Sequence, residues 1–250
     1  MYQLHFHNPV PIHFIGIGGI SMSGLAEILL KESFPVSGSD SHASELTDHL
    51  TRLGAQIRIG QKASNIPADC EVVVYTAAIH PDNPEFVAAK ERGIPMLSRA
   101  ELLGQLMRNY KKAIAVSGTH GKTTTSSMLA HILTHAGEGN LADPSYAIGG
   151  SIQGKDGMML DGGHAGQGDV LVAEADESDG SFAKYHPEIA IVTNSEADHL
   201  DHYGTQENYR AAFVDHVQHA AKSVVMCGDD EGNLAVLRAL DASSAAHTVV

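Results

Sequence analysis

The sequence is poor in cysteine and in basic residues. It contains 2 cysteines, Cys70 and Cys227, and 16 lysines and arginines against 30 aspartates and glutamates. Two thiols far apart in the sequence indicate a reducing compartment rather than a disulfide framework, so we expect both to be buried as small apolar side chains. The formal net charge of −14 argues against the basic surface that nucleic acids or anionic membranes require, and we expect neither as a partner.

Long apolar runs are also missing. No uninterrupted apolar stretch approaches the roughly 20 residues that cross a bilayer. The opening residues lack the basic start and the small-residue cleavage site of a secretion signal. We therefore expect a cytoplasmic protein. The composition itself, 43% apolar and 18% charged over 250 residues, is that of a globular chain with one large domain or two ordinary ones.

A pattern of strand, loop and helix runs along the chain and restarts near its middle. Residues 12–15 predict a buried strand, followed by a glycine-rich turn and apolar residues at helical spacing. The pattern begins again with a strand over 113–117, a second glycine loop and a helix over 123–135. Alternating strands and helices predict an α/β fold with parallel sheets. We predict a Rossmann-like domain over residues 1–110 and a P-loop-type mononucleotide-binding domain over residues 111–250.

The first glycine loop, GIGGIS at residues 16–21, comes close to the G-x-G-x-x-G fingerprint, with Ser21 in place of the third glycine. Glycines permit a tight turn and let a diphosphate approach the backbone amides at the helix start. Asp40 ends the next predicted strand, about where an acid would meet a ribose hydroxyl. The loop alone fits NAD, FAD or a UDP-sugar equally well, and it also fits a tight turn that binds nothing.

The second glycine loop reads GTHGKTTT, which is shorter than a Walker A loop because only two residues separate its glycines. Its chemistry is still that of a phosphate cradle. Gly118 and Gly121 allow backbone amides to approach an anion, and Lys122 adds a positive charge beside them. Thr123 or Thr124 supplies a hydroxyl for Mg²⁺. The plainer alternative is a helix start with a solvated lysine.

Polar side chains follow two later apolar strands. In EADESD, Glu174 emerges first from the valine-rich strand and is the best-placed metal ligand, because ligands bind at the carboxyl ends of parallel strands. The second stretch, VTNSEADHLDHY, brings Asn194, His199 and His202 close together. A zinc site at His199 and His202 is a weaker alternative, since no third and fourth ligands follow at a telling spacing. The glycine-rich residues 149–168 predict surface loops or a hairpin.

Taken together and in this order, these stretches resemble the Mur ligase family of peptidoglycan synthesis. The match covers residues 13–203 and includes HFIGIGGISMSGLAEIL, VSGSD, SRAELLGQLMR, SGTHGKTTTSSMLA, IGG, EADESDGSF and VTNSEADHLDHY. The short second loop resembles the family's own form of the ATP site. The motifs are most similar to those of the alanine-adding branch.

The resemblance implies a ligase that uses ATP and Mg²⁺ to join L-alanine to the carboxylate of UDP-N-acetylmuramate through an acyl phosphate. Such an enzyme would be a monomer or a homodimer. A recycling ligase of the same family, which attaches a ready-made tripeptide to UDP-N-acetylmuramate, is the nearest alternative. From other classes, an NAD(P)-dependent oxidoreductase built on the first loop and a non-catalytic nucleotide-sugar-binding module stay open.

The resemblance also implies roles for individual residues. Lys122 would hold the β- and γ-phosphates, while Thr123, Glu174 and His199 would bind Mg²⁺. Lys122, Glu174 and His199 would thus be the catalytic residues. The ATP-binding set would be Gly118, Thr119, His120, Gly121, Lys122, Thr123 and Thr124. The UDP-sugar-binding set would be Gly16, Gly18, Gly19, Ile20, Ser21, Asp40, Thr76, Arg99, His120 and Asn194.

Some features depart from the family's pattern. Several sister ligases carry a carbamylated lysine where this chain has about Phe213, which favours the alanine-adding branch. Three domains of ordinary size exceed 250 residues, and the sequence ends in an apolar run. We therefore expect a piece of a longer protein, without the family's C-terminal domain and with an incomplete central domain.

Overall fold

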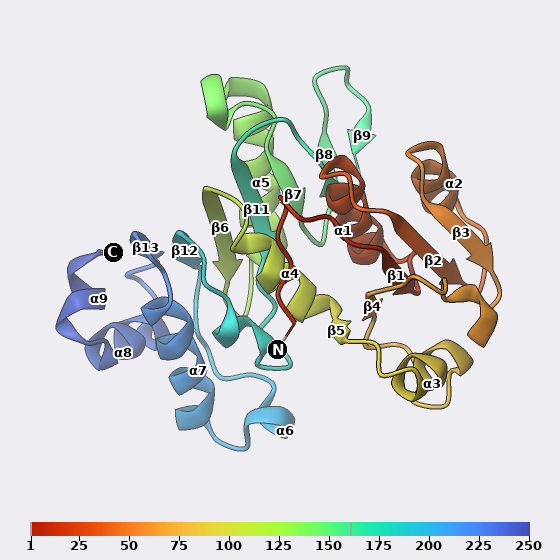
Figure 1. The fold of residues 1–250 in the computed structure, drawn as a ribbon. Coiled ribbons are helices and arrows are strands. Elements are labelled where there is room, and N and C mark those ends of the chain that lie inside the picture. The colour runs from red at the N-terminus through yellow and green to blue at the C-terminus, as the bar shows by residue number, and fades with distance from the viewer. Residues whose placement is uncertain (1, 161) are drawn as a thin grey trace. The chain divides into compact units, whose positions relative to one another are not determined.

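The computed structural model describes residues 2–160 and 162–250, and the chain divides into two compact α/β units (Figure 1). One unit comprises Met1–Asn109 and Asp161–Ala165, and the other comprises Tyr110–Leu160 and Gly166–Val250. Each unit has its own parallel sheet, which confirms the predicted α/β class. That residues 1–110 and 111–250 form two separate domains stays a prediction.

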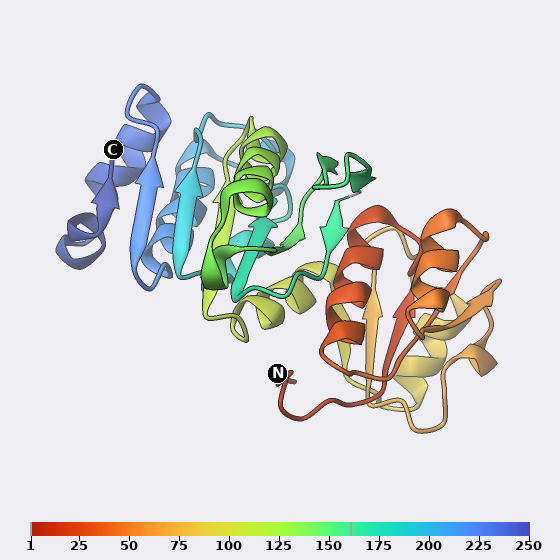
Figure 2. The same cartoon turned by 90° about the horizontal axis from the view of Figure 1, so that it is seen from above.

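A five-stranded parallel sheet forms the centre of the first unit, in the order β3-β2-β1-β4-β5. Its strands are β1 Ile12–Ile15, β2 Val36–Asp40, β3 Gln56–Ile59, β4 Val72–Tyr75 and β5 Met96–Ser98. The helices are α1 Ile20–Lys31, α2 Glu45–Arg52, α3 Pro84–Glu91 and α4 Arg99–Met107, with a 3-10 turn at Ala63–Asn65. In Figure 2 the red and orange helices α1 and α2 lie on one face of this sheet. The strand order reverses between β1 and β4, and that crevice is where open α/β sheets bind ligands.

Local sequence signals set the helix starts in this unit. Ser98 Oγ accepts a hydrogen bond from Glu101 N at 3.2 Å, and Glu101 Oε2 accepts one from Ser98 N at 2.8 Å. This capping box satisfies amides that the first turn of α4 would otherwise leave unpaired. Asn83 Oδ1 caps α3 by accepting from the amides of Glu85 and Phe86, and Pro84 takes the first helical position, which needs no amide donor.

The strands of the second unit are parallel and follow the order β7-β11-β6-β12-β13-β14. They are β6 Lys112–Ser117, β7 Ser145–Ala147, β11 Val170–Glu174, β12 Ile189–Val192, β13 Ser223–Met226 and β14 Thr248–Val249. The helices are α5 Lys122–Ala136, α6 Leu200–Tyr203, α7 Gln206–Gln218, α8 Glu231–Ala239 and α9 Ala242–Ala246, with 3-10 turns at Gly139–Leu141 and Ser181–Lys184. The three adjacent strands β11, β6 and β12 each end at a predicted functional motif.

The glycine-rich residues 149–168 contain an antiparallel hairpin of β8 (Ile152–Gln153) and β9 (Met159–Leu160). The sequence analysis had predicted either surface loops or a hairpin here. The short strand β10 (Gly163–His164) follows and belongs to the first unit. There it packs on α1: a Cβ placed on Gly24 would lie 2.4 Å from Gly163 Cα. Glycine at both positions therefore permits a backbone contact that no larger residue allows.

The two cysteines differ in their surroundings. Cys70 is buried, as predicted, but the prediction for Cys227 was wrong, because this residue is exposed. The strand β13 ends at Met226, so Cys227 already lies outside the packed part of the sheet. Among the helices of the described residues, none combines the length and apolarity of a bilayer-spanning segment.

A fully buried histidine of α7, His216, lies in the aromatic core that this helix covers. The rings of Phe182 and Phe213 lie 4.9 Å apart, centre to centre, and His216 packs against Phe182 at the same separation. His216 Nδ1 donates to the Phe182 carbonyl at 3.0 Å. Burial lowers the pKa of His216 from 6.5 to about 4. Phe213, about where the resemblance implies a carbamylated lysine in other family members, is thus a core residue here.

We expect His216 to weaken the fold in mild acid. Between pH 6.5 and about 4 the unfolded chain protonates this residue while the folded chain does not, so the free energy of unfolding falls as the pH falls through that window. The contribution of this one group is about 3 kcal/mol. Urea denaturation of His216→Asn, which keeps a donor for the Phe182 carbonyl, should show a flatter pH dependence than the wild type. His247→Asn, at an exposed histidine that does not act on His216, should leave the slope unchanged; an unchanged slope in His216→Asn would contradict the assignment.

Candidate functional site

The second glycine loop joins the end of β6 to the start of α5. Gly118 and Gly121 have φ angles of 133° and 82°, which lie in the left-handed region that favours glycine. A Cβ on Gly118 would lie 2.0 Å from Thr193 Oγ1, so the loop also packs too closely there for any side chain. The helix α5 starts without a side-chain cap. Its first amides and its dipole therefore suit an anion.

Lys122 folds back over this loop and meets a buried carboxylate. Its Nζ donates to Gly118 O at 2.7 Å, to Thr119 O at 3.3 Å and to Glu177 Oε1 at 3.0 Å. Glu177 Oε2 is also within ion-pair distance, at 2.8 Å, although without hydrogen-bond geometry. The side chain of Lys122 is 14% exposed and that of Glu177 is 0% exposed. Burial raises the pKa of Glu177, and the neighbouring Lys122 opposes that shift.

Thr123 and Glu174, two of the residues that the resemblance assigned to Mg²⁺, contact each other at the adjacent strand end. Thr123 Oγ1 lies 3.0 Å from both Glu174 oxygens, and Gly149 N donates to Glu174 Oε2 at 2.8 Å. A Cβ on Gly149 would lie 2.9 Å from Glu174 Oε2 and 3.1 Å from Thr123 Oγ1, so glycine leaves space beside the pair. A hydroxyl and a carboxylate next to a phosphate cradle are the donors that Mg²⁺ takes together with water and phosphate oxygens. These residues fit that ion.

Asn194 ties the end of β12 to the loop. Its Oδ1 accepts from His120 N at 2.9 Å, and its Nδ2 donates to His120 O at 2.9 Å. Thr119 is buried, and its Oγ1 lies 2.7 Å from both Glu196 O and Tyr209 Oη. The side chains of Asn194 and Thr119 thus hold the loop in shape, which the sequence did not reveal. The side chains of His120 and Thr124 are exposed.

His199 lies against Glu177 rather than in the contact between Thr123 and Glu174. Its Nε2 is 3.7 Å from Glu177 Oε1, and its side chain is 37% exposed. Its φ of 50° is unusual for a residue other than glycine. Within residues 2–160 and 162–250, no three His, Cys, Asp or Glu side chains form a group that could hold a metal, which gives the zinc alternative at His199 and His202 no support. Magnesium ligation by His199 stays a prediction.

Glu177 is the residue that the sequence analysis missed. Among the acids of EADESD we predicted Glu174 alone, because it follows the strand directly. Glu177 lies three residues after Glu174, in the turn that follows β11. This turn brings the Glu177 side chain to Lys122. Its backbone carbonyl is fixed by Gly180 N at 3.0 Å and by the Tyr203 hydroxyl. The four acids of EADESD were themselves a signal that a carboxylate lies close to the loop. The spacing of the sequence cannot show which of the four is buried.

In the first unit, a pocket of about 770 Å³ opens at the strand reversal. The predicted residues that line it are Gly16, Gly18, Gly19, Ser21, Asp40 and Thr76. Ile20 and Arg99 are not among its lining residues, and Ile20 is 56% exposed. The other two residues of the predicted UDP-sugar set, His120 and Asn194, belong to the second unit.

Asp40 is already engaged with the first loop. Its Oδ2 accepts a hydrogen bond from Gly18 N at 2.8 Å, and a Cβ on Gly18 would come within 2.9 Å of that oxygen. The sequence prediction gave this amide to a diphosphate and Asp40 to a ribose. In the structure Asp40 supports the loop, with its other oxygen turned to Ser41 and His42. A contact of Asp40 with a ribose stays a prediction.

A buried acid holds the wall of this pocket in place. Glu85 Oε2 lies 2.9 Å from His13 Nε2 and accepts from Ser39 Oγ at 2.7 Å. Its Oε1 accepts from Asn65 Nδ2 at 2.7 Å and from Lys62 N at 3.0 Å. Burial works against the ionised form, but these hydrogen bonds hold the pKa of Glu85 below its usual value. The start of α3, which contributes to the pocket lining, is thereby fastened to β1 and β2.

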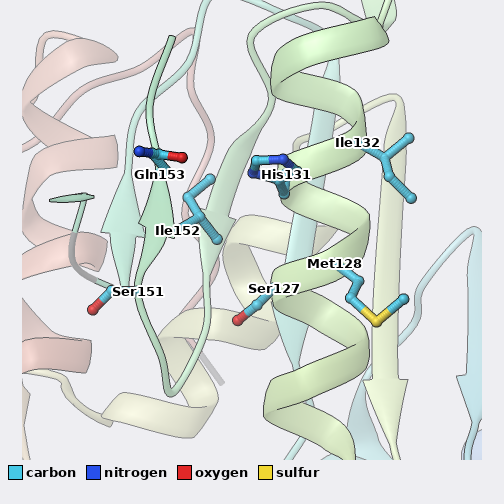
Figure 3. Close-up of a pocket in the computed structure, with 7 residues that line it drawn as sticks. All are labelled: Ser127, Met128, His131, Ile132, Ser151, Ile152 and Gln153. Atoms are coloured by element: carbon cyan, nitrogen blue, oxygen red, sulfur yellow. The ribbon is translucent and has the colours of Figure 1, made fainter. Parts of the chain in front are cut away.

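A second pocket, of about 390 Å³, lies between α5 and the start of the β8–β9 hairpin (Figure 3). Its lining consists of Ser127, Met128, His131, Ile132, Ser151, Ile152 and Gln153. Figure 3 shows the first four projecting from α5. None of these residues is among those predicted to bind nucleotide or UDP-sugar.

The fold and the two loops define a class of protein: a pair of parallel α/β units, each with a glycine-rich loop at its strand ends, the second of the phosphate-loop type. Comparison with known families agrees. Residues 11–111 match the Mur ligase family catalytic domain, and residues 116–249 match the Mur ligase middle domain. The chain belongs to the Mur ligase family.

Several relatives carry the same description, UDP-N-acetylmuramate–L-alanine ligase. The protein of that name from Bifidobacterium adolescentis is 66% identical over 244 residues, covering 98% of this chain and 46% of the relative. The one from Lachnospira eligens is 53% identical and covers 85% of this chain and 45% of its own length. The chain therefore spans about half the length of the curated relatives it matches.

Solved structures agree with these relatives. The crystal structure of UDP-N-acetylmuramate-alanine ligase from Thermotoga maritima has 35% identity and a TM-score of 0.77, covering 91% of this chain and 51% of that one. The structure of UDP-N-acetylmuramate:L-alanyl-gamma-D-glutamyl-meso-diaminopimelate ligase from Neisseria meningitides has 28% identity and a TM-score of 0.74, covering 93% and 75% respectively.

Proposed function

We propose that the chain supplies the UDP-sugar-binding and ATP-binding parts of an ATP-dependent ligase that joins L-alanine to UDP-N-acetylmuramate. The observation that carries the proposal is the contact between Thr123 and Glu174 directly beside the loop that holds Lys122. Three motifs far apart in the sequence thereby meet at the ends of β11, β6 and β12. The names of the relatives, at 50 to 66% identity, support the choice of L-alanine.

In this proposal the second unit positions ATP. The amides of residues 118–122 and the Lys122 ammonium hold the β- and γ-phosphates, as charge-bearing groups do in other phosphoryl transfers. Thr123 and Glu174 hold Mg²⁺, with His199 as a further proposed ligand; when bound, the ion neutralises charge on the phosphate oxygens. The carboxylate of the sugar attacks the γ-phosphorus and ADP leaves, after which the amine of L-alanine displaces phosphate from the acyl carbon. Holding the reactants in place accounts for much of the acceleration.

The first unit binds UDP-N-acetylmuramate in the 770 Å³ pocket. The positive-φ turn at Gly16 leads the chain into α1, which starts after Gly19 without a side-chain cap, and the first amides of this helix hold the diphosphate. Thr76, which follows β4, and Asp40 lie beside this loop, with Arg99 as a further candidate for the sugar or uridine. His120 and Asn194, in the second unit, are the proposed neighbours of the substrate carboxylate.

The alternatives fit less well. The recycling ligase is represented by the Neisseria structure at 28% identity, well below the relatives named for L-alanine. An NAD(P)-dependent oxidoreductase leaves Lys122, Thr123 and Glu174 without a role. A cytoplasmic location and a monomeric or homodimeric state are part of this proposal.

Calorimetric titration of the 250-residue chain tests the proposal. We expect UDP-N-acetylmuramate to bind, and ADP to bind more tightly with Mg²⁺ than without it. UDP-N-acetylglucosamine, which lacks the lactyl carboxylate, is the matched control for the sugar site and should bind more weakly. Binding of NAD(P)H in place of UDP-N-acetylmuramate would overturn the assignment of the first loop. Absence of ADP binding would overturn the assignment of the second.

A further inference from the structure

We propose that Glu177 competes with the phosphates of the nucleotide for Lys122, so that nucleotide binding requires exchange of this carboxylate for a phosphate oxygen. The inference rests on the proposed function, because it concerns the same phosphate cradle. Glu177 would act through Lys122 and is therefore a positioning residue. It makes the affinity of the loop for anions depend on a buried charge within the protein.

The first step of the argument is the number of donors on Lys122. An ammonium group has three N–H bonds. In the structure Lys122 uses them on Gly118 O at 2.7 Å, on Thr119 O at 3.3 Å and on Glu177 Oε1 at 3.0 Å. A phosphate oxygen can therefore accept a hydrogen bond from Lys122 only after one of these three acceptors is released.

The second step is which acceptor is released. The two carbonyls belong to the loop itself, which the reciprocal bonds between Asn194 and His120 hold in shape. They carry no net charge and do not repel a phosphate. Glu177 carries a negative charge when it is paired with Lys122, and like charges a few ångströms apart repel strongly in a site with little water. The carboxylate is therefore the partner that exchanges.

The third step is that the side chain of Glu177 can move without the backbone. Its carbonyl oxygen is fixed by Gly180 N at 3.0 Å and by the Tyr203 hydroxyl. Its carboxylate is held less completely: within the described chain, no hydrogen-bond donor reaches Oε2 with suitable geometry. His199 Nε2 lies 3.7 Å from Oε1, beyond hydrogen-bond distance. A rotation of the Glu177 side chain away from Lys122, with its backbone carbonyl still held by Gly180 and Tyr203, is the exchange that this geometry allows.

Such a competitor has a clear consequence for selectivity. Only an anion that makes several contacts at once, with the loop amides as well as with Lys122, can displace a carboxylate that is already in place. A nucleotide diphosphate or triphosphate meets that condition, whereas inorganic phosphate makes fewer contacts. Glu177 would then keep Lys122 charged and oriented while excluding small anions.

The test is the affinity for ADP with Mg²⁺, measured by calorimetry on the whole chain. Glu177→Gln keeps the shape and the acceptor but removes the charge, and we expect its Kd for ADP to be about tenfold lower than that of the wild type. Inorganic phosphate should gain measurable binding. Asp179→Asn is the matched control, since Asp179 is exposed in the same loop and accepts from Ser181 N at 2.9 Å. Its effect should stay below about twofold, because solvent and salt screen an exposed charge.

An equal or weaker affinity in Glu177→Gln overturns the inference, and so does an equal gain in Asp179→Asn, which would show a general effect of charge. If the wild type binds no ADP, the proposed function fails as well. Should Glu177→Gln not fold, a crystal structure of the wild type with ADP and Mg²⁺ decides. Lys122 Nζ bonded to phosphate and more than about 4 Å from Glu177 supports the exchange; Lys122 still bonded to Glu177 overturns it.

Discussion

Replacement of Lys122 by methionine is expected to weaken binding of ADP with Mg²⁺ by about tenfold to a hundredfold. The change removes a charge-assisted hydrogen bond to phosphate, and such bonds contribute about 1.5–3 kcal/mol. Methionine keeps most of the length and apolar volume of the lysine stem. The measurement is calorimetric titration of the variant and the wild type. Binding of ADP with unchanged affinity would rule out the phosphate cradle.

The same substitution should also destabilise the fold. It leaves Glu177, whose side chain is 0% exposed, without its cation, and removing one partner of a buried ion pair costs about 3 kcal/mol or more. The double variant Lys122→Met, Glu177→Gln separates the two effects. We expect it to recover most of the free energy of unfolding in urea while nucleotide binding stays weak. Recovery of both would mean that Lys122 acts on the nucleotide only by holding the fold.

Replacement of Gly118 by alanine is expected to be the most damaging single change in the loop. Its Cβ would lie 2.0 Å from Thr193 Oγ1 and 2.9 Å from Asn194 O, on a backbone with a φ of 133°. Unfavourable φ and overpacking each cost about 1–3 kcal/mol. Because both neighbours belong to the segment that follows β12, relief of the clash would displace the loop from the strand end. Binding of ADP should fall below detection.

A matched control separates the clash from the backbone strain. Gly54 has a φ of 107°, and nothing lies within 4 Å of a Cβ placed on it, so Gly54→Ala introduces strain alone. We expect Gly118→Ala to lower the free energy of unfolding in urea by clearly more than Gly54→Ala does. Within the loop, Gly121→Ala, with a φ of 82° and open space around it, should be intermediate for ADP binding. An equal loss of stability in Gly118→Ala and Gly54→Ala would contradict the steric account.

Much of this protein followed from the sequence by itself. The alternation of apolar strands with helical periodicity predicts two parallel sheets, and strand 12–15 is found as β1. The glycines at 118 and 121 predict a loop that larger residues cannot form, and their positive φ angles are the physical reason. The contact between Thr123 and Glu174 follows from the same pattern, since Glu174 ends β11 and the loop before Thr123 follows β6, which pairs with β11. The roles of these residues toward a nucleotide stay predictions.

What only the tertiary structure decided is which partner each polar group has. Four acids of EADESD compete in the sequence, and the turn after β11 buries Glu177 on Lys122. Asp40 meets the amide of Gly18 because β1 and β2 pair side by side, and Asn194 meets His120 because β12 pairs with β6. Periodicity and backbone conformation are local properties that a few neighbouring residues set. Burial and the choice of hydrogen-bond partner depend on segments that lie tens of residues apart, and these come together only when the sheet forms.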